Sequence, residues 1–120
     1  MSLPNPSDAI AASGLTHRFG EILATDDVSL TVPAGAVYGL LGPDGAGKST
    51  LLRMLATVLR ADAGDASVFG HSVTRDAGAV TPLIGYMSQQ FCLYPDLSVA
   101  ENIEFFARLR GVDLATRRTR

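Results

Sequence analysis

The sequence predicts an α/β fold, and three observations lead to this prediction. A short, continuously apolar segment at 36–41 is followed at once by a glycine-rich loop at 42–50. Behind the loop, residues 49–59 carry apolar side chains at the spacing of one helix face. Ahead of it, residues 9–35 contain short apolar segments and turn signals typical of antiparallel strands. We therefore expect a strand buried on both faces of a parallel sheet, then a loop, then a helix.

The elements before the loop divide into two parts. Residues 1–8 contain two prolines and an asparagine and are expected to be a flexible lead-in. Residues 9–35 are expected to form a small antiparallel β subdomain, with strand segments at 9–15, 22–24 and 28–32. The stretch Phe19-Gly20-Glu21 and the stretch Pro33-Ala34-Gly35 are the turns between and after them.

The elements after the loop are two further strands and a second helix. Residues 36–60 form the expected strand, loop and helix, and strands are predicted at 68–69 and 83–87. A helix begins after Ser98, which with Glu101 has the spacing of a capping box, and Gly111 is placed to end it. Asp113 could cap another helix.

Composition limits the classes of function. The chain has 120 residues, of which 47% are apolar, enough for one domain or part of one. Its formal net charge of −2 gives no overall attraction to nucleic acid, and the arginines gathered near the C-terminus read as a solvated helix face. The sequence shows no signal peptide and no apolar run long enough to span a membrane. Cys92 is the single cysteine and cannot form an internal disulfide, which fits a reducing compartment. We therefore expect a soluble cytoplasmic chain.

The loop carries the chemistry, because it fits the pattern G-x-x-x-x-G-K-[ST] in full. Glycines let successive backbone N–H groups point into one concavity, and the following helix directs its positive end there. Lys48 is the chain's single lysine and is expected to reach the β- and γ-phosphates of a nucleotide. The alternative is a glycine turn that merely joins a strand to a helix. The predicted phosphate-binding residues are Gly42, Pro43, Asp44, Gly45, Ala46, Gly47, Lys48, Ser49 and Thr50.

Two hydroxyl groups complete this prediction. The Ser49 hydroxyl is expected to ligate Mg²⁺, which bridges phosphate oxygens of ATP, and Thr50 adds a donor near the phosphates. ATP and Mg²⁺ are therefore the expected cofactors.

The tract GLTHRFGEILATDDVSLTVPAGAVYGLLGPDGAGKSTLLRML resembles the β unit and phosphate loop of the nucleotide-binding domain of ABC transporters. The resemblance implies a P-loop ATPase core with an N-terminal antiparallel β subdomain. It also places Phe19 where the family has an aromatic residue, often tyrosine, that stacks on adenine. An ordinary core aromatic is the alternative for Phe19.

The tract IGYMSQQFCLYPDLSVAENIEFFARLRG is similar to the family's glutamine loop and the helix after it. The resemblance assigns Gln89 to contact with Mg²⁺ and the attacking water, which would make Lys48 and Gln89 the catalytic residues and Ser49 and Gln89 the metal ligands. A shift of one residue in the alignment with the family would select Gln90 instead. The alternative for Gln89 is a polar residue on a surface loop without a functional role. His17 and His71 match no histidine of the family pattern and are expected at the surface.

The resemblance implies a subunit that couples ATP binding and hydrolysis to transport. The sequence of the second tract is most similar to multidrug exporters of the ABC-2 type. A membrane-spanning permease and a second ATP-binding domain would be its partners, at the inner face of the cell membrane. Residues 84–120 would be the glutamine loop and the start of a helical subdomain that the chain truncates. The later acidic, signature and histidine motifs are missing, so these residues alone should bind ATP without efficient hydrolysis.

Three other readings stay open. Another P-loop enzyme, such as a kinase or GTPase, is disfavoured. In those enzymes the strand before the loop usually lies near the start of the domain, whereas about forty residues precede the loop here. A soluble ABC-type ATPase acting on ribosomes or DNA shares the loop, and a binding-only remnant would share it too.

Overall fold

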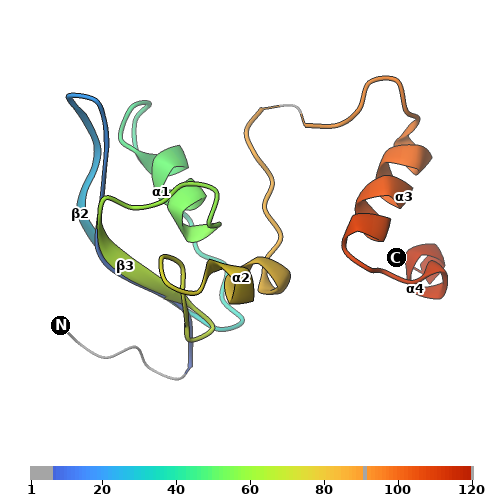
Figure 1. Ribbon diagram of the computed structural model, residues 1–120, viewed down its shortest axis with the longest axis horizontal. Helices are drawn as coiled ribbons and strands as arrows, with labels where there is room; N and C mark the ends of the chain where they lie inside the picture. Colours follow the sequence, from blue (N-terminus) through green and yellow to red (C-terminus); the bar gives the residue numbers. More distant parts are fainter. Residues whose placement is uncertain (1–6, 91, 120) are drawn as a thin grey trace. The chain divides into compact units, whose positions relative to one another are not determined.

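The computed structural model describes residues 7–90 and 92–119 (Figure 1). The chain forms two compact units, residues 1–86 and residues 87–120. Among the residues that the structure describes, no helix combines the length and apolar character needed to cross a membrane.

The first unit is built on a four-stranded antiparallel sheet with strand order β2-β1-β3-β4. Strands β1 (Asp8–Phe19) and β2 (Ile22–Pro33) form one long hairpin whose tip is the turn at residues 20–21. Strand β3 (Ala63–Val68) pairs with β1, and the two-residue strand β4 (His71–Ser72) pairs with β3. The predicted antiparallel β segments are therefore confirmed, and two of the predicted segments merge into β2.

Helices cover one region of this sheet and close the core. Helix α1 (Lys48–Leu55) follows the glycine loop, and the short helix α2 (Ala77–Val80) leads into a single 3₁₀ turn, η1 (Thr81–Leu83). Buried side chains of the sheet, of both helices and of the turn after β4 form one apolar cluster: Ala12, Leu15, Leu51, Met54, Leu55, Ala66, Val68, Val73 and Val80. Burial of this cluster is the main stabilising contribution to the unit, since each fully buried aliphatic side chain contributes about 1.5–3 kcal/mol.

The strand predicted at 36–41 is not formed, and this prediction was wrong. The segment has no regular structure. Val37 is fully exposed at 103% of its reference area and Leu41 at 94%. A strand buried on both faces needs neighbours on both sides for its backbone N–H and C=O groups. None of the strands in the described part of the chain pairs with these residues, so water must solvate them.

Three smaller boundary predictions also differ from the structure. The strand predicted at 83–87 is absent, because η1 occupies its start and residues 84–88 have no regular structure. Strand β3 ends at Val68, and Phe69 turns away with a φ of 47°. Helix α1 ends at Leu55 rather than near residue 59, since Thr57 takes a left-handed φ of 64° that no helix continues through.

Asp65 joins β3 to β4 and the turn that follows it. Its carboxylate accepts hydrogen bonds from the hydroxyl groups of Ser72 at 2.6 Å and Thr74 at 2.9 Å, and the guanidinium of Arg75 lies 3.3 Å away. Burial alone would raise the pKa of Asp65, but these hydroxyl bonds and the bond from the Ala66 N–H outweigh it and hold the pKa below its ordinary value.

Because the folded-state pKa of Asp65 is lowered, its contribution to stability is present above about pH 4 and is lost as the pH falls further. We expect Asp65→Asn to lower the free energy of unfolding by about 1 kcal/mol at pH 7, a small value because the side chain is 32% exposed. The difference from wild type should shrink below about pH 4. Urea unfolding at pH 3, 5 and 7 measures it, with the exposed Asp26→Asn as the control of equal charge. A difference that persists unchanged at pH 3 would contradict the assignment.

The second unit consists of α3 (Val99–Leu109) and α4 (Leu114–Thr119) after an irregular segment. The Ser98 hydroxyl accepts the Glu101 N–H at 3.1 Å, and Gly111 has a φ of 70°, so the predicted cap and stop of this helix are confirmed. The Asp113 carboxylate accepts the Thr116 N–H at 2.7 Å and thereby caps α4, as predicted. The two hydrogen bonds from Thr116 lower the pKa of Asp113.

Candidate functional site

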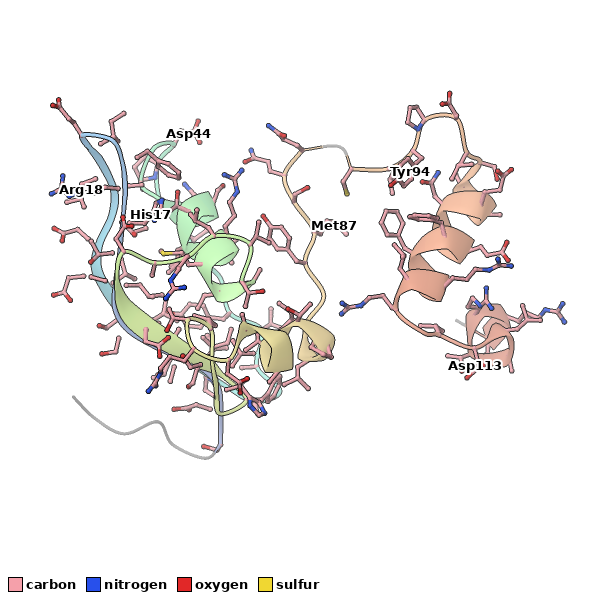
Figure 2. All side chains as sticks on the ribbon, in the orientation of Figure 1. His17, Arg18, Asp44, Met87, Tyr94 and Asp113 are labelled. Carbon is pink, nitrogen blue, oxygen red and sulfur yellow. The ribbon has the colours of Figure 1, made fainter. Side chains whose placement is uncertain are left out.

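The glycine loop folds as a tight turn that leads into α1. The Ala46 N–H donates to the Pro43 carbonyl at 3.2 Å, and Gly45 and Gly47 have φ values of 85° and 93°. Such left-handed backbone is open to glycine at little cost, which explains why the sequence has glycine at both positions. Figure 2 shows Asp44 on this loop, at the end of α1 where the helix begins.

Gly47 connects the loop to the sheet. It is the N-cap of α1, and a Cβ at this position would lie 2.1 Å from the Ala24 carbonyl oxygen and 3.2 Å from the Thr25 methyl group. Only a residue without a side chain allows the loop backbone to approach β2 so closely. The phosphate loop is thereby fixed against the hairpin.

Lys48 extends back across the loop from the first turn of α1. Its Nζ donates to the Gly42 carbonyl at 2.5 Å and the Pro43 carbonyl at 2.8 Å. These bonds hold the one lysine charge of the chain over the loop, where the helix dipole also favours an anion. Ser49 is exposed and free to reach a ligand, whereas Thr50 is 8% exposed and packs into the unit.

Phe19 lies at the same end of the hairpin as the loop. It is the last residue of β1 and pairs with Ile22, while Ala24, only two residues further along β2, carries the contact with Gly47. The ring is 46% exposed, so one face can receive a planar ligand. The structure thus brings Phe19 and the phosphate loop into one neighbourhood.

His17 is not the surface residue that the sequence predicted. It is 8% exposed, and its ring centroid lies 4.6 Å from that of Phe19 with an interplanar angle of 72°. His17 lies on the buried face of β1 together with Leu15, which explains its burial. His71 is exposed, as predicted, and its Nδ1 lies 3.2 Å from the Asp76 carboxylate.

Gln89 belongs to the second unit, in a stretch without helix or strand. It is exposed, and next to it the Ser88 hydroxyl donates to the Gln90 carbonyl at 2.9 Å. Cys92 is exposed as well. The role of Gln89, and the choice between Gln89 and Gln90, stay predictions.

Sequence reasoning missed Asn102, which anchors the end of the stretch that holds Gln89. Asn102 is 6% exposed, and its side chain binds both backbone groups of Tyr94. The Oδ1 atom accepts the Tyr94 N–H at 2.9 Å, and Nδ2 donates to the Tyr94 carbonyl at 3.1 Å and to the Ser98 carbonyl at 2.9 Å. The signal available in the sequence was an asparagine inside a predicted helix, where its propensity is poor.

We expect Asn102→Ala to release residues 94–98 from α3, because the Tyr94 N–H loses its acceptor. Hydrogen exchange of the Tyr94 amide should become about tenfold faster, because the loss of one hydrogen bond lowers the free energy of local opening by roughly 1.4 kcal/mol. The Thr116 amide, which donates to the Asp113 carboxylate outside this segment, is the internal control and should exchange at an unchanged rate. Unchanged Tyr94 exchange in the alanine variant would contradict the anchoring role.

The described residues, 7–90 and 92–119, contain no group of three or more His, Cys, Asp or Glu side chains that could hold a metal ion.

Comparison with known proteins gives a consistent result. The ABC transporter family matches residues 25–120. The chain is 46% identical over 115 residues to the daunorubicin/doxorubicin resistance ATP-binding protein of Streptomyces peucetius, covering 96% of this chain and 35% of that protein. It is 47% identical over 105 residues to a probable multidrug ABC transporter ATP-binding protein of Escherichia coli, covering 86% of this chain and 18% of that protein. The chain thus spans about a third or less of the length of these relatives.

Solved structures agree on the fold. A dimeric ATP-binding cassette in a post-hydrolysis state with ADP and phosphate superposes with a TM-score of 0.75 at 26% identity, covering 92% of this chain and 53% of that one. The ATP-binding subunit of another ABC transporter superposes with a TM-score of 0.77 at 22% identity, covering 89% of this chain and 45% of that one, a likeness of fold alone. The family match over most of the chain, together with the geometry of the phosphate loop, shows that this chain belongs to the ABC transporter family.

Proposed function

We propose that this chain is the ATP-binding part of the ATPase subunit of an ABC exporter. The observation that carries the proposal is the complete phosphate loop at the N-terminus of α1, fixed to β2 through Gly47. The drug-resistance and multidrug names of the relatives support export as the direction of transport.

The loop and α1 would bind the phosphates of ATP. Residues 42–50 would supply backbone N–H groups, and Lys48 would exchange its two carbonyl partners for the β- and γ-phosphate oxygens. Thr50, largely buried at the base of the loop, would donate through its backbone N–H rather than reach outward. The charge of Lys48 would stabilise the phosphoryl group during hydrolysis.

Mg²⁺ would be held mainly by the nucleotide. This ion keeps waters and substrate phosphate oxygens as ligands and takes only one or two from the protein. The exposed Ser49 hydroxyl, in the first turn of α1, is a suitable hard oxygen donor. Gln89 would supply an amide oxygen toward the ion and the attacking water.

Phe19 would stack on the adenine ring. Its exposed face, its place at the hairpin tip and the anchoring of the phosphate loop two residues further along β2 support this role. Stacking alone accepts any purine, so the site should bind ATP and GTP with affinities within about tenfold of each other.

The complete protein would hydrolyse ATP as a dimer of ATP-binding domains and pass the change to a membrane-spanning permease at the cytoplasmic face of the membrane. The dimeric state and bound hydrolysis products of the similar cassette support this arrangement. The stretch around Gln89 would report the nucleotide state to the permease.

Calorimetric titration of the protein with ATP tests the proposal, with Mg²⁺ present and again with the metal removed by a chelator. We expect saturable ATP binding that weakens at least severalfold without Mg²⁺, because the ion neutralises phosphate charge at the site. GTP serves as the comparison for base selectivity. No binding of ATP at millimolar concentration, or a strong preference for GTP, would overturn the proposal.

A further inference from the structure

His17 contacts Phe19 directly, although no motif marks it. The two rings meet edge to face, with centroids 4.6 Å apart and planes at 72°. This arrangement is one that aromatic pairs prefer, because the positive edge of one ring meets the negative face of another. A residue at the exposed tip of a hairpin has few neighbours that could fix its orientation, so this contact restricts the Phe19 ring.

His17 is itself held firmly. Its backbone pairs with Thr25 across the hairpin, and its side chain is only 10% exposed. Nδ1 lies 3.4 Å from the Asp62 carboxylate but makes no hydrogen bond, so this contact fixes the position of the ring through packing alone. His17 can therefore serve as a fixed support for the half-exposed Phe19 ring.

Asp62 links this support to the segment that follows α1. Its backbone N–H donates to the Thr16 carbonyl at 2.9 Å, and its Oδ2 atom accepts the Arg18 N–H at 2.8 Å. Asp62 thus binds the residues immediately before and after His17. His17 and Arg18 follow one another on β1 (Figure 2), with His17 buried and Arg18 exposed. Through Thr25, whose methyl group borders Gly47, the partner strand of His17 also contacts the phosphate loop.

We propose that His17 is a positioning residue that orients the Phe19 ring for stacking on the nucleobase. The inference rests on the proposed function, since it requires Phe19 to contact the base. His17 lies on β1, outside the loop at 42–50, and acts through Phe19. Its removal therefore weakens recognition of the base and leaves recognition of the phosphates intact.

Two substitutions of His17 separate the ring from the bulk of the side chain. His17→Leu fills a similar buried volume without an aromatic edge, whereas His17→Phe keeps an aromatic edge in a somewhat larger ring that has no nitrogens. Each is titrated with ATP and with inorganic tripolyphosphate, which offers the phosphate chain without a base. We expect His17→Leu to weaken ATP binding about three- to tenfold and to leave tripolyphosphate binding unchanged. We expect His17→Phe to bind ATP with the affinity of the wild type.

The same substitutions in a Phe19→Ala background complete the test. If His17 acts through Phe19, His17→Leu has no further effect on ATP once the Phe19 ring is gone. Equal weakening of ATP and tripolyphosphate, an undiminished effect in the Phe19→Ala background, or no effect at all would each overturn the role of His17. If the wild-type protein binds tripolyphosphate and ATP with equal affinity, the proposed contact between Phe19 and the base is wrong. Wild-type protein that binds neither ligand would remove the proposed function itself.

Discussion

Replacing Lys48 by alanine is expected to weaken ATP binding by about ten- to a hundredfold. The ammonium group is held over the loop by the carbonyl oxygens of Gly42 and Pro43, at the place where the β- and γ-phosphates would bind. A hydrogen bond between two charged groups contributes about 1.5–3 kcal/mol, and each 1.4 kcal/mol is a factor of ten in affinity. Calorimetric titration with ATP in the presence of Mg²⁺ measures the loss.

Arg53→Ala is the matched control for this prediction. Arg53 is an exposed cation in the last turn of the same helix, and its removal changes the net charge by the same amount. It should alter ATP affinity less than twofold, because exposed charges at a distance are screened by salt. Equal losses in the two variants would mean that general electrostatic attraction, not the phosphate loop, holds the nucleotide.

Gly47→Ala is expected to disrupt both the site and the fold. A Cβ would lie 2.1 Å from the Ala24 carbonyl oxygen, and the φ of 93° is itself unfavourable for alanine. Because the obstacle is backbone of β2, either the loop or the strand must move. We expect a loss of about 2–4 kcal/mol in the free energy of unfolding and the loss of ATP binding. Urea unfolding followed by circular dichroism, with an ATP titration, measures both.

Gly45→Ala separates the cost of left-handed backbone from the cost of a steric clash with β2. Gly45 has a similar φ of 85°, but a Cβ there would meet no atom within 4 Å. This variant should lose only about 1–2 kcal/mol, the cost of left-handed backbone for one residue. If the two variants were equally stable, the contact between the loop and β2 would not be what requires glycine at 47.

Local signals in the sequence were enough for several elements. The alternation and turn signals at 9–35 predicted antiparallel strands there, and the Ser98 and Asp113 caps predicted where two helices begin. These features depend on residues within a few positions of one another, so a single sequence shows them. The glycine loop was found for the same reason, because its pattern spans only eight residues, 42–49.

Features that depend on distant partners were missed or misjudged. The apolar character of 36–41 predicted a buried strand, but a strand forms only where another pairs with it. His17 was expected at the surface, although β1 turns it toward the interior and Asp62, far along the chain, lies against it. Asn102 stood out only as a poor helix former inside a predicted helix, and its role stayed hidden because its partners are backbone atoms, which any residue would supply.

The sequence by itself determined the residue pattern on which the proposed chemistry rests: a lysine, a serine and glycines at the spacing of the nucleotide-binding pattern, directly ahead of a helix. Only the tertiary structure decided how that loop is held and what lies beside it. Gly47 meets the backbone of β2 at Ala24, and Asp62 lies against His17 although 45 positions separate them in the chain. Short-range patterns set residue types, whereas burial and contact arise from residues that folding brings together across the chain.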